Sequence, residues 1–184
     1  VGFILIGLAA ATPAGVSGAL TYLAIYVAMV IGSFTALLML RDPAGNNLET
    51  FADISGLSTK RPALAWSLLA LMFSLAGIPP LFGFWGKFVV FQAAVQADLV
   101  ALAAIGIAAS VIGAFYYLKF VKVMFFDEPL STAPEGEAVI ADSPTGHWVV
   151  LGLSALLMSP LGYLATPWLE GVADRAARAL FTVV

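Results

Sequence analysis

The fold of this chain is decided by residues 74–88, which read SLAGIPPLFGFWGKF. They lie inside an apolar stretch, 62–97, that would measure about 54 Å as one straight helix, far more than the ~30 Å hydrocarbon core of a bilayer. Pro79 and Pro80 cannot donate backbone hydrogen bonds, and proline disfavours helix in the residue before it. We therefore expect one discontinuous membrane helix, broken at Gly77–Pro80, with helical pieces over 63–76 and 81–97.

The composition of the rest of the chain also indicates a lipid bilayer. Of 184 residues, 61% are hydrophobic and only 10% are charged, whereas a soluble domain carries roughly a quarter charged residues. The stretches 1–40, 62–86, 99–118 and 143–169 contain no Asp, Glu, Lys or Arg. The last three are each close to the ~20 apolar residues that cross a hydrocarbon core as a helix. The predicted fold class is an all-α polytopic membrane protein, a transmembrane helix bundle.

The pattern of apolar stretches and turns predicts the organisation of the chain. We interpret residues 1–184 as the C-terminal part of one membrane domain within a longer protein. The expected elements are a partial span (1–11), a full span (16–40), the discontinuous span (62–97), two further spans (99–125 and 147–167) and a short amphipathic tail (168–184). Pro160 is expected to bend the last span.

Basic residues near the ends of the spans predict the orientation, because cytoplasmic loops carry an excess of Lys and Arg. Five of them fall on one side of the membrane and two on the other. The first group is Arg41, Lys60, Arg61, Lys119 and Lys122, and the second is Arg175 and Arg178. This bias places the two long loops in the cytoplasm, and the 96–98 turn and the C-terminus in the periplasm.

Lys87 is the main candidate for a functional residue, because it is the only charged residue in 62–97. A charge in mid-membrane costs from about 3 to more than 10 kcal/mol, so such residues usually face a polar cavity and have a function. The alternative is a lysine that snorkels to the interface, but the end of the span lies about 15 Å away. We expect Lys87 to transfer protons, beside a cavity at the break formed by Gly77, Pro79 and Pro80.

The remaining residues of interest are interpreted as structural or are assigned no functional role. Gly106, Ser110 and Ala114 recur every fourth residue, which favours close helix packing. Ser74 could bond water or its own helix and is assigned no role, and His147 is an ordinary interfacial histidine. With no cysteine and one histidine, we expect no disulfide, iron–sulfur cluster, haem or other metal site in this chain. The net charge of −3 argues against a nucleic-acid surface.

Residues 74–88 resemble the discontinuous twelfth helix of the antiporter-like subunits of respiratory complex I. Residues 115–119 and 121–126, FYYLK and VKVMFF, resemble the next helix of subunit N in particular, and residues 2–8, GFILIGL, match the end of its tenth helix. The resemblance implies that Lys87 is the protonatable lysine of a proton half-channel. It also implies that the chain works in a proton-translocating NADH:quinone oxidoreductase of the bacterial cytoplasmic (inner) membrane. Its partners would be neighbouring membrane subunits and the lipid bilayer, with FMN, iron–sulfur clusters and quinone bound by other subunits.

Two alternatives share this sequence pattern. A subunit of a multisubunit sodium/proton antiporter or of a membrane-bound hydrogenase would carry the same broken helix and lysine. A structural membrane scaffold without a transport role is the third interpretation.

Overall fold

The computed structural model describes residues 1–42, 44–128 and 143–182. Within them the chain forms helices, and the only β feature is an isolated bridge between Arg41 and Asn47. The predicted all-α bundle with a helix broken at Gly77–Pro80 is confirmed. In chain order the elements are α1 (Gly2–Ala9), α2 (Pro13–Leu38), α3 (Leu57–Lys60), α4 (Pro62–Ala76), α5 (Phe82–Gln96), α6 (Val100–Phe126), α7 (Thr145–Met158), the 3-10 helix η1 (Pro160–Ala165) and α8 (Thr166–Phe181).

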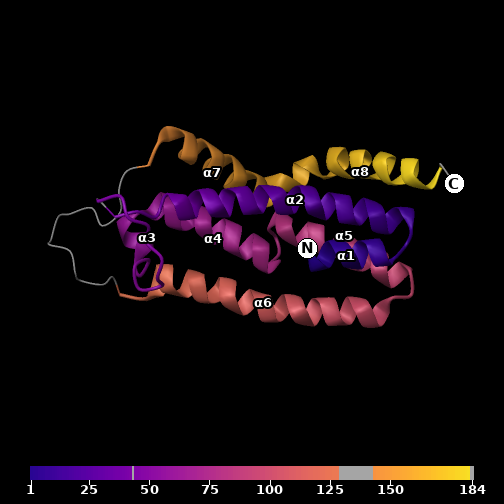
Figure 1. The fold of residues 1–184 in the computed structure, drawn as a ribbon, viewed down its shortest axis with the longest axis horizontal. Coiled ribbons are helices and arrows are strands. Elements are labelled where there is room, and N and C mark those ends of the chain that lie inside the picture. The colour runs from indigo at the N-terminus through magenta and orange to yellow at the C-terminus, as the bar shows by residue number, and fades with distance from the viewer. Residues whose placement is uncertain (43, 129–142, 183–184) are drawn as a thin grey trace.

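Helix α2 runs through the middle of the bundle and contacts α1, α4, α5, α7 and α8. Its start is fixed by Thr12, whose Oγ1 accepts a hydrogen bond from the Gly15 N–H at 3.1 Å, and by Pro13 in the first turn. Figure 1 shows α4 and α5 following one another alongside α2, with α6 on one side and α7 and α8 on the other. The break between α4 and α5 therefore lies inside the bundle.

Two helices of the described residues, α2 and α6, are long and apolar enough to cross a bilayer. They contain 26 and 27 residues, or about 39 Å and 40 Å of helix. Much of the apolar surface of α6 is exposed, including Ile105, Val111 and Ile112. Such an extended apolar surface suits contact with lipid chains or with other membrane helices.

Apolar packing holds the two halves of the broken helix separately. Leu68 of α4 is buried in a cluster with Met29 of α2 and Met124 of α6. Val90 of α5 is buried in a second cluster with Tyr22 of α2. Because each half has its own buried contacts, the break does not depend on α4 and α5 forming a continuous helical axis.

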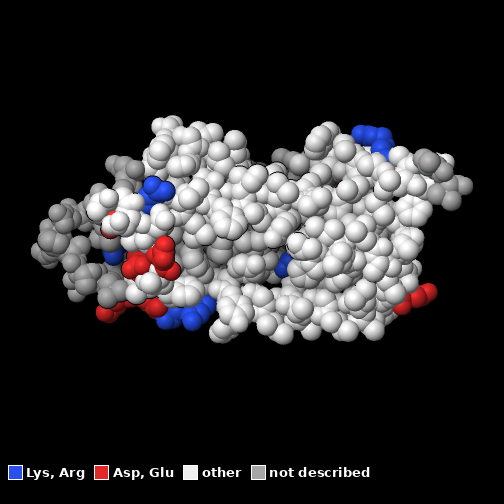
Figure 2. Space-filling model, in the orientation of Figure 1, with Lys and Arg blue, Asp and Glu red and all other residues white. Residues whose placement is uncertain are grey.

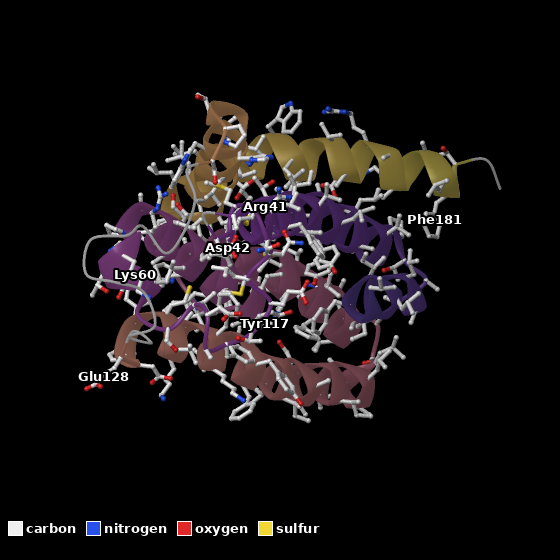
Figure 3. The ribbon with its side chains drawn as sticks, turned by 60° about the vertical axis from the view of Figure 1, so that its left-hand side comes forward. Arg41, Asp42, Lys60, Tyr117, Glu128 and Phe181 are labelled. Atoms are coloured by element: carbon white, nitrogen blue, oxygen red, sulfur yellow. The ribbon has the colours of Figure 1, made fainter. Side chains whose placement is uncertain are left out.

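Charged side chains gather toward the ends of the molecule. Figure 2 shows blue and red groups near both ends of a largely white face, with one blue patch in its middle. Figure 3 turns one end forward and shows Arg41, Asp42, Lys60 and Glu128 at that end, with Phe181 far from them at the end of α8. The second of the two long loops lies largely outside the described residues.

The last segment is bent at Pro160, and its second helix continues beyond the span expected over 147–167. Helix α7 ends at Met158, Ser159 adopts an extended backbone, and α7 and the segment from Pro160 to Phe181 are bent by 74°. The physical reason is local: Pro160 has no N–H to continue the α7 ladder, and the Ser159 side chain accepts from the Leu161 N–H at 3.2 Å to begin a new turn. The residues expected as a tail are the body of α8, which packs on α2 through Ala173 and Ala177.

Candidate functional site

The site is built on the end of α4, where Gly77 takes a left-handed backbone conformation (φ 84°, ψ 39°) that favours glycine. The Ile78 N–H donates to the Phe73 carbonyl, and the Gly77 N–H donates to the Ser74 carbonyl, both at 3.0 Å. These two bonds form a Schellman motif, which satisfies two of the four carbonyls that every helix leaves free at its C-terminus. The carbonyls of Leu75 and Ala76 remain.

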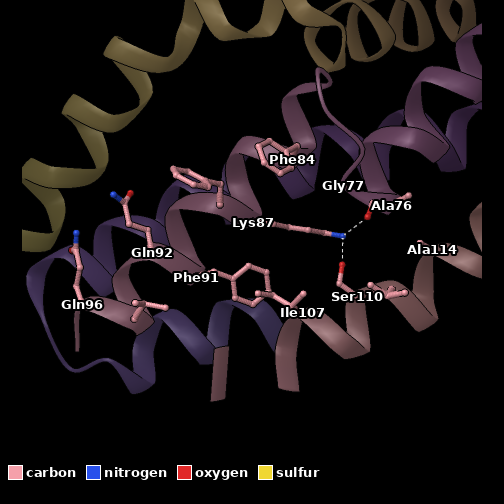
Figure 4. A pocket seen from close by; sticks show the side chains of 13 residues that line it. Ala76, Gly77, Phe84, Lys87, Phe91, Gln92, Gln96, Ile107, Ser110 and Ala114 are labelled. Atoms are coloured by element: carbon pink, nitrogen blue, oxygen red, sulfur yellow. Dashed lines mark hydrogen bonds between the residues drawn. The ribbon is translucent and has the colours of Figure 1, made fainter. Parts of the chain in front are cut away.

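Lys87 supplies the donors for those two carbonyls. Its Nζ donates to the oxygens of Leu75 and Ala76, at 2.9 Å each, and to Ser110 Oγ of α6 at 2.8 Å. Figure 4 shows the bonds to Ala76 and Ser110. An ammonium has three N–H donors, so all three are used. The negative end of the α4 dipole also lies at these carbonyls. This arrangement explains how the chain holds a positive charge on a side chain that is only 7% exposed.

The start of α5 is fixed against the end of α4 at the break. Ser74 Oγ, on α4, accepts a hydrogen bond from the Gly83 N–H of α5 at 2.8 Å. A Cβ at Gly83 would lie 2.2 Å from the Ser74 carbonyl oxygen, so only glycine allows this approach. Because Lys87 follows Gly83 by about one helical turn, this contact sets the height at which its ammonium meets the end of α4.

An aromatic ring closes one side of the ammonium. The Phe3 ring of α1 lies 5.1 Å from Lys87 Nζ, within the range of a cation–π contact. Phe3 is itself held edge-on by Tyr22 and Phe91, each with ring centroids 5.6 Å away. In the part of the chain that the structure describes, no carboxylate lies within ion-pair distance of Lys87.

On another side, Lys87 borders a cavity of about 610 Å³. The lining side chains of α5 and α6 are mostly apolar and aromatic, and the polar groups among them are those of Lys87, Ser110, Gln92 and Gln96. Figure 4 shows Ser110 reaching across from α6 to Lys87, while Gln92 and Gln96 lie further along α5. The structure thus brings Lys87 and Gly77 together at the break, beside a cavity whose other walls come from α5 and α6.

The two prolines have a less direct place than the sequence suggested. Pro79 and Pro80 lie in the connection between α4 and α5, and their side chains are not among those lining the Lys87 cavity. They act by ending the backbone ladder, because neither has an N–H to donate. The Leu81 N–H then bonds back to the Ile78 carbonyl at 3.1 Å, which compacts the connection before α5 begins.

A second, smaller hollow of about 150 Å³ lies at the far end of α5, where Gln92 and Gln96 face α8 and the start of α2. Here Ser17 of α2 donates to Asp174, and Trp85 Nε1 donates to Glu170 Oε1 at 2.8 Å. These contacts join α8 to α2 and α5. Within the described residues no group of three His, Cys, Asp or Glu side chains is placed to hold a metal ion.

Sequence reasoning missed Ser110 and Ser74 as members of the site. Ser110 was interpreted as part of a packing ridge, and Ser74 was given no role. Neither partner could be found from spacing, because both contacts join different helices whose relative rotation is set by tertiary packing. For Ser110 a chemical signal was available: a buried lysine requires hydrogen-bond acceptors, and a serine on a neighbouring apolar helix is a natural candidate.

Comparison with known proteins gives consistent matches. Residues 1–113 match the family model described as NADH:quinone oxidoreductase/Mrp antiporter, transmembrane. The chain is 71% identical over 181 residues to NADH-quinone oxidoreductase subunit N of Erythrobacter litoralis and 54% identical to that of Rhizorhabdus wittichii, each match covering 98% of this chain. The chain spans 36% and 37% of the length of these two relatives.

Solved structures share the fold. A chain of respiratory complex I from Thermus thermophilus superposes with a TM-score of 0.71 at 27% identity, covering 91% of this chain and 36% of the other. A chain of the Mrp complex from Dietzia superposes with a TM-score of 0.69 at 23% identity, covering 94% and 39%, a likeness of fold alone.

Proposed function

Because this chain belongs to the NADH:quinone oxidoreductase/Mrp antiporter transmembrane family, we propose that it forms part of subunit N of a proton-translocating NADH:quinone oxidoreductase, with Lys87 as an intramembrane proton-transfer group. The observation that carries the proposal is the environment of Lys87: a buried amine whose hydrogen-bond acceptors come from a helix break and from one serine. Intramembrane ionisable groups of this kind mark ion and proton pathways.

The geometry couples the proton on Lys87 to the packing around it. With its proton, the amine satisfies the Leu75 and Ala76 carbonyls and holds α4, α5 and α6 together. Without it, the amine has two N–H donors for the two carbonyls and a lone pair to which the Ser110 hydroxyl can donate, so the contact with α6 reverses direction and charge-assisted hydrogen bonds become neutral ones, each weaker by about 1 kcal/mol. A change of about 1 kcal/mol shifts a two-state equilibrium by about fivefold. Events elsewhere in the complex that favour one packing would therefore load or release the proton.

In this proposal the chain supplies proton transfer and other subunits supply electron transfer. FMN, iron–sulfur clusters and quinone would be bound elsewhere in the complex, whose further membrane subunits would contact the exposed apolar surfaces described above. The location would be the bacterial cytoplasmic (inner) membrane. The basic end with Arg41 and Lys60 would face the cytoplasm, and the end with Arg175 would face the periplasm.

A multisubunit sodium/proton antiporter is the second candidate, favoured by the fold shared with a chain of the Mrp complex. The two candidate functions differ in the proteins that form a complex with this chain. Affinity purification of the tagged chain from native membranes should recover flavin and iron–sulfur proteins together with NADH:quinone oxidoreductase activity. Recovery of membrane subunits alone would favour the antiporter.

The direct test replaces Lys87 by alanine in the complete complex, with proton pumping and NADH:quinone turnover measured in proteoliposomes. We expect pumping and coupled turnover to fall while the complex still assembles. Lys122→Ala is the matched control, because Lys122 is an exposed lysine paired with Asp127 at the end of α6; it should pump like the unmodified complex. Unchanged pumping in Lys87→Ala would refute the assigned role.

A further inference from the structure

We propose that the Ser110 hydroxyl is the relay through which Lys87 exchanges its proton with the adjoining cavity. This inference rests on the proposed function of Lys87 and deepens it. Three groups accept hydrogen bonds from Lys87 Nζ: the carbonyls of Leu75 and Ala76, and Ser110 Oγ. Ser110 differs from the other two in chemistry, in location and in access to the cavity.

The chemical difference concerns the direction in which a proton can move. A carbonyl oxygen accepts hydrogen bonds but has no proton to give, so Leu75 and Ala76 can hold the charged amine without returning a proton to the neutral one. A hydroxyl both accepts and donates. Ser110 is therefore the one hydrogen-bond partner of Lys87, among the described residues, that can serve in both directions.

The location of Ser110 adds a path beyond Lys87. It is half-buried on α6, lines the 610 Å³ cavity, and makes no side-chain hydrogen bond within the described residues other than the one it accepts from Lys87. Its own O–H proton is thus available to point into the cavity. Another neighbour of the amine is the Phe3 ring, which attracts a cation but has no site that takes up a proton at ordinary pH.

The transfer is a concerted exchange that leaves no charge on serine. As the proton leaves, one Nζ–H bond of Lys87 breaks and a new bond forms to Ser110 Oγ. The original O–H proton of Ser110 passes at the same time to a water molecule in the cavity, which becomes hydronium. Lys87 is left as a neutral amine, Ser110 is a neutral hydroxyl as before, and the reverse sequence reloads the lysine.

The competing explanation is that Ser110 only positions Lys87. Three variants of the complete complex separate the two roles, with assembly checked for each. Ser110→Ala removes the hydroxyl, Ser110→Thr keeps it, and the pair Ser110→Ala with Ala114→Ser moves it along α6 by about 6 Å within the same cavity. Ser67→Ala is the matched control, because the Ser67 hydroxyl bonds the Ala63 carbonyl of its own helix at 2.9 Å.

We expect Ser110→Ala to lower proton pumping about tenfold, less than the ~10²–10⁴-fold typical of a direct acid–base group, because water can partly replace the hydroxyl. Ser110→Thr should restore pumping, and the double variant should not. The solvent deuterium isotope effect on coupled turnover should change in Ser110→Ala, because this variant alters the route of the transferred proton. It should stay unchanged in Ser67→Ala. If Ser110 only positioned Lys87, the effect would also stay unchanged in Ser110→Ala.

The outcomes distinguish the Ser110 relay from the proposed function of Lys87 on which it rests. Normal pumping in Ser110→Ala, combined with impaired pumping in Lys87→Ala, overturns the relay and leaves the proposed function standing. Equal loss in Ser110→Ala and Ser110→Thr also overturns the relay, because the hydroxyl would then not be the group that matters. Normal pumping in both Lys87→Ala and Ser110→Ala overturns the proposed function itself.

Discussion

Replacing Gly77 by alanine should strain the helix break and displace the ammonium of Lys87. Gly77 has a φ of +84°, and the left-handed conformation costs a residue with a Cβ about 1–2 kcal/mol. The added Cβ would also lie 2.9 Å from Cδ and 3.0 Å from Nζ of Lys87, both closer than ordinary van der Waals contact. The substitution therefore acts on the backbone and on the site at once.

The magnitude of the second effect follows from how Lys87 is held. Its Nζ makes hydrogen bonds of 2.8 Å and 2.9 Å to three fixed acceptors, so the side chain cannot retreat from the new Cβ without lengthening at least one of them. A hydrogen bond to a charged group contributes about 1.5–3 kcal/mol, and weakening one should cost roughly half of that. Together with the backbone strain, Gly77→Ala should destabilise the membrane domain by about 2–4 kcal/mol.

The assay is chemical denaturation of the purified complex in detergent, combined with proton pumping in proteoliposomes. Gly113→Ala is the matched control: Gly113 lies inside α6, and a Cβ there meets nothing within 4 Å, so the change should be neutral or stabilise by up to about 1 kcal/mol. In a Lys87→Ala background the cost of Gly77→Ala should fall to the ~1–2 kcal/mol of backbone strain. Equal stability and pumping in Gly77→Ala and Gly113→Ala would refute the reasoning.

Three further predictions concern the attachment of α8, the turn at Asp42 and the orientation of the chain in the membrane. Glu170→Gln weakens the hydrogen bond from Trp85 Nε1 that ties α8 to α5, and should destabilise the domain by about 1 kcal/mol in the same denaturation assay; no change would mean that this bond does not help to hold α8. Hydrogen bonds from the side chain and backbone of Asn46 hold the pKa of Asp42 below its usual value, so the turn they form should be stable at neutral pH and be lost as the pH falls through that lowered pKa. Hydrogen exchange at the Asn46 amide should show this loss on acidification, and Asp42→Asn should abolish the pH dependence. A cysteine replacing Lys60 should react with a membrane-impermeant maleimide in inverted vesicles but not in intact cells, and the reverse pattern would contradict the proposed orientation.

The break and its lysine could be predicted from the sequence because both depend on local chemistry. Two adjacent prolines after a glycine end a helix in any surroundings, and a lone lysine in an apolar stretch needs polar partners wherever the stretch is folded. The contact of Lys87 with the carbonyls of Leu75 and Ala76 was not predicted, because it depends on how the connection after Gly77 sets the start of α5 against the end of α4.

The remaining parts of the site depend on contacts between segments far apart in the chain. Ser110 meets Lys87 only because α6 packs beside the break, and no pattern within α6 fixes which of its faces does so. The bend was expected at Pro160, but its size of 74° could not be predicted, because proline fixes where the helix is interrupted and not the direction in which α8 then packs on α2. The local sequence predicts that a helix is interrupted, whereas tertiary contacts determine the direction of each helical segment.

The Leu75 and Ala76 carbonyls have a consequence for how this site tolerates variation. The acceptors belong to the main chain, so exchanging the side chains at these two positions leaves both oxygens in place. Apolar exchanges of similar size there should keep both acceptors, while the glycine that shapes the turn should resist replacement. The groups that accept hydrogen bonds from this buried charge belong to the backbone. Mutations therefore alter them mainly through the residues that bend the chain.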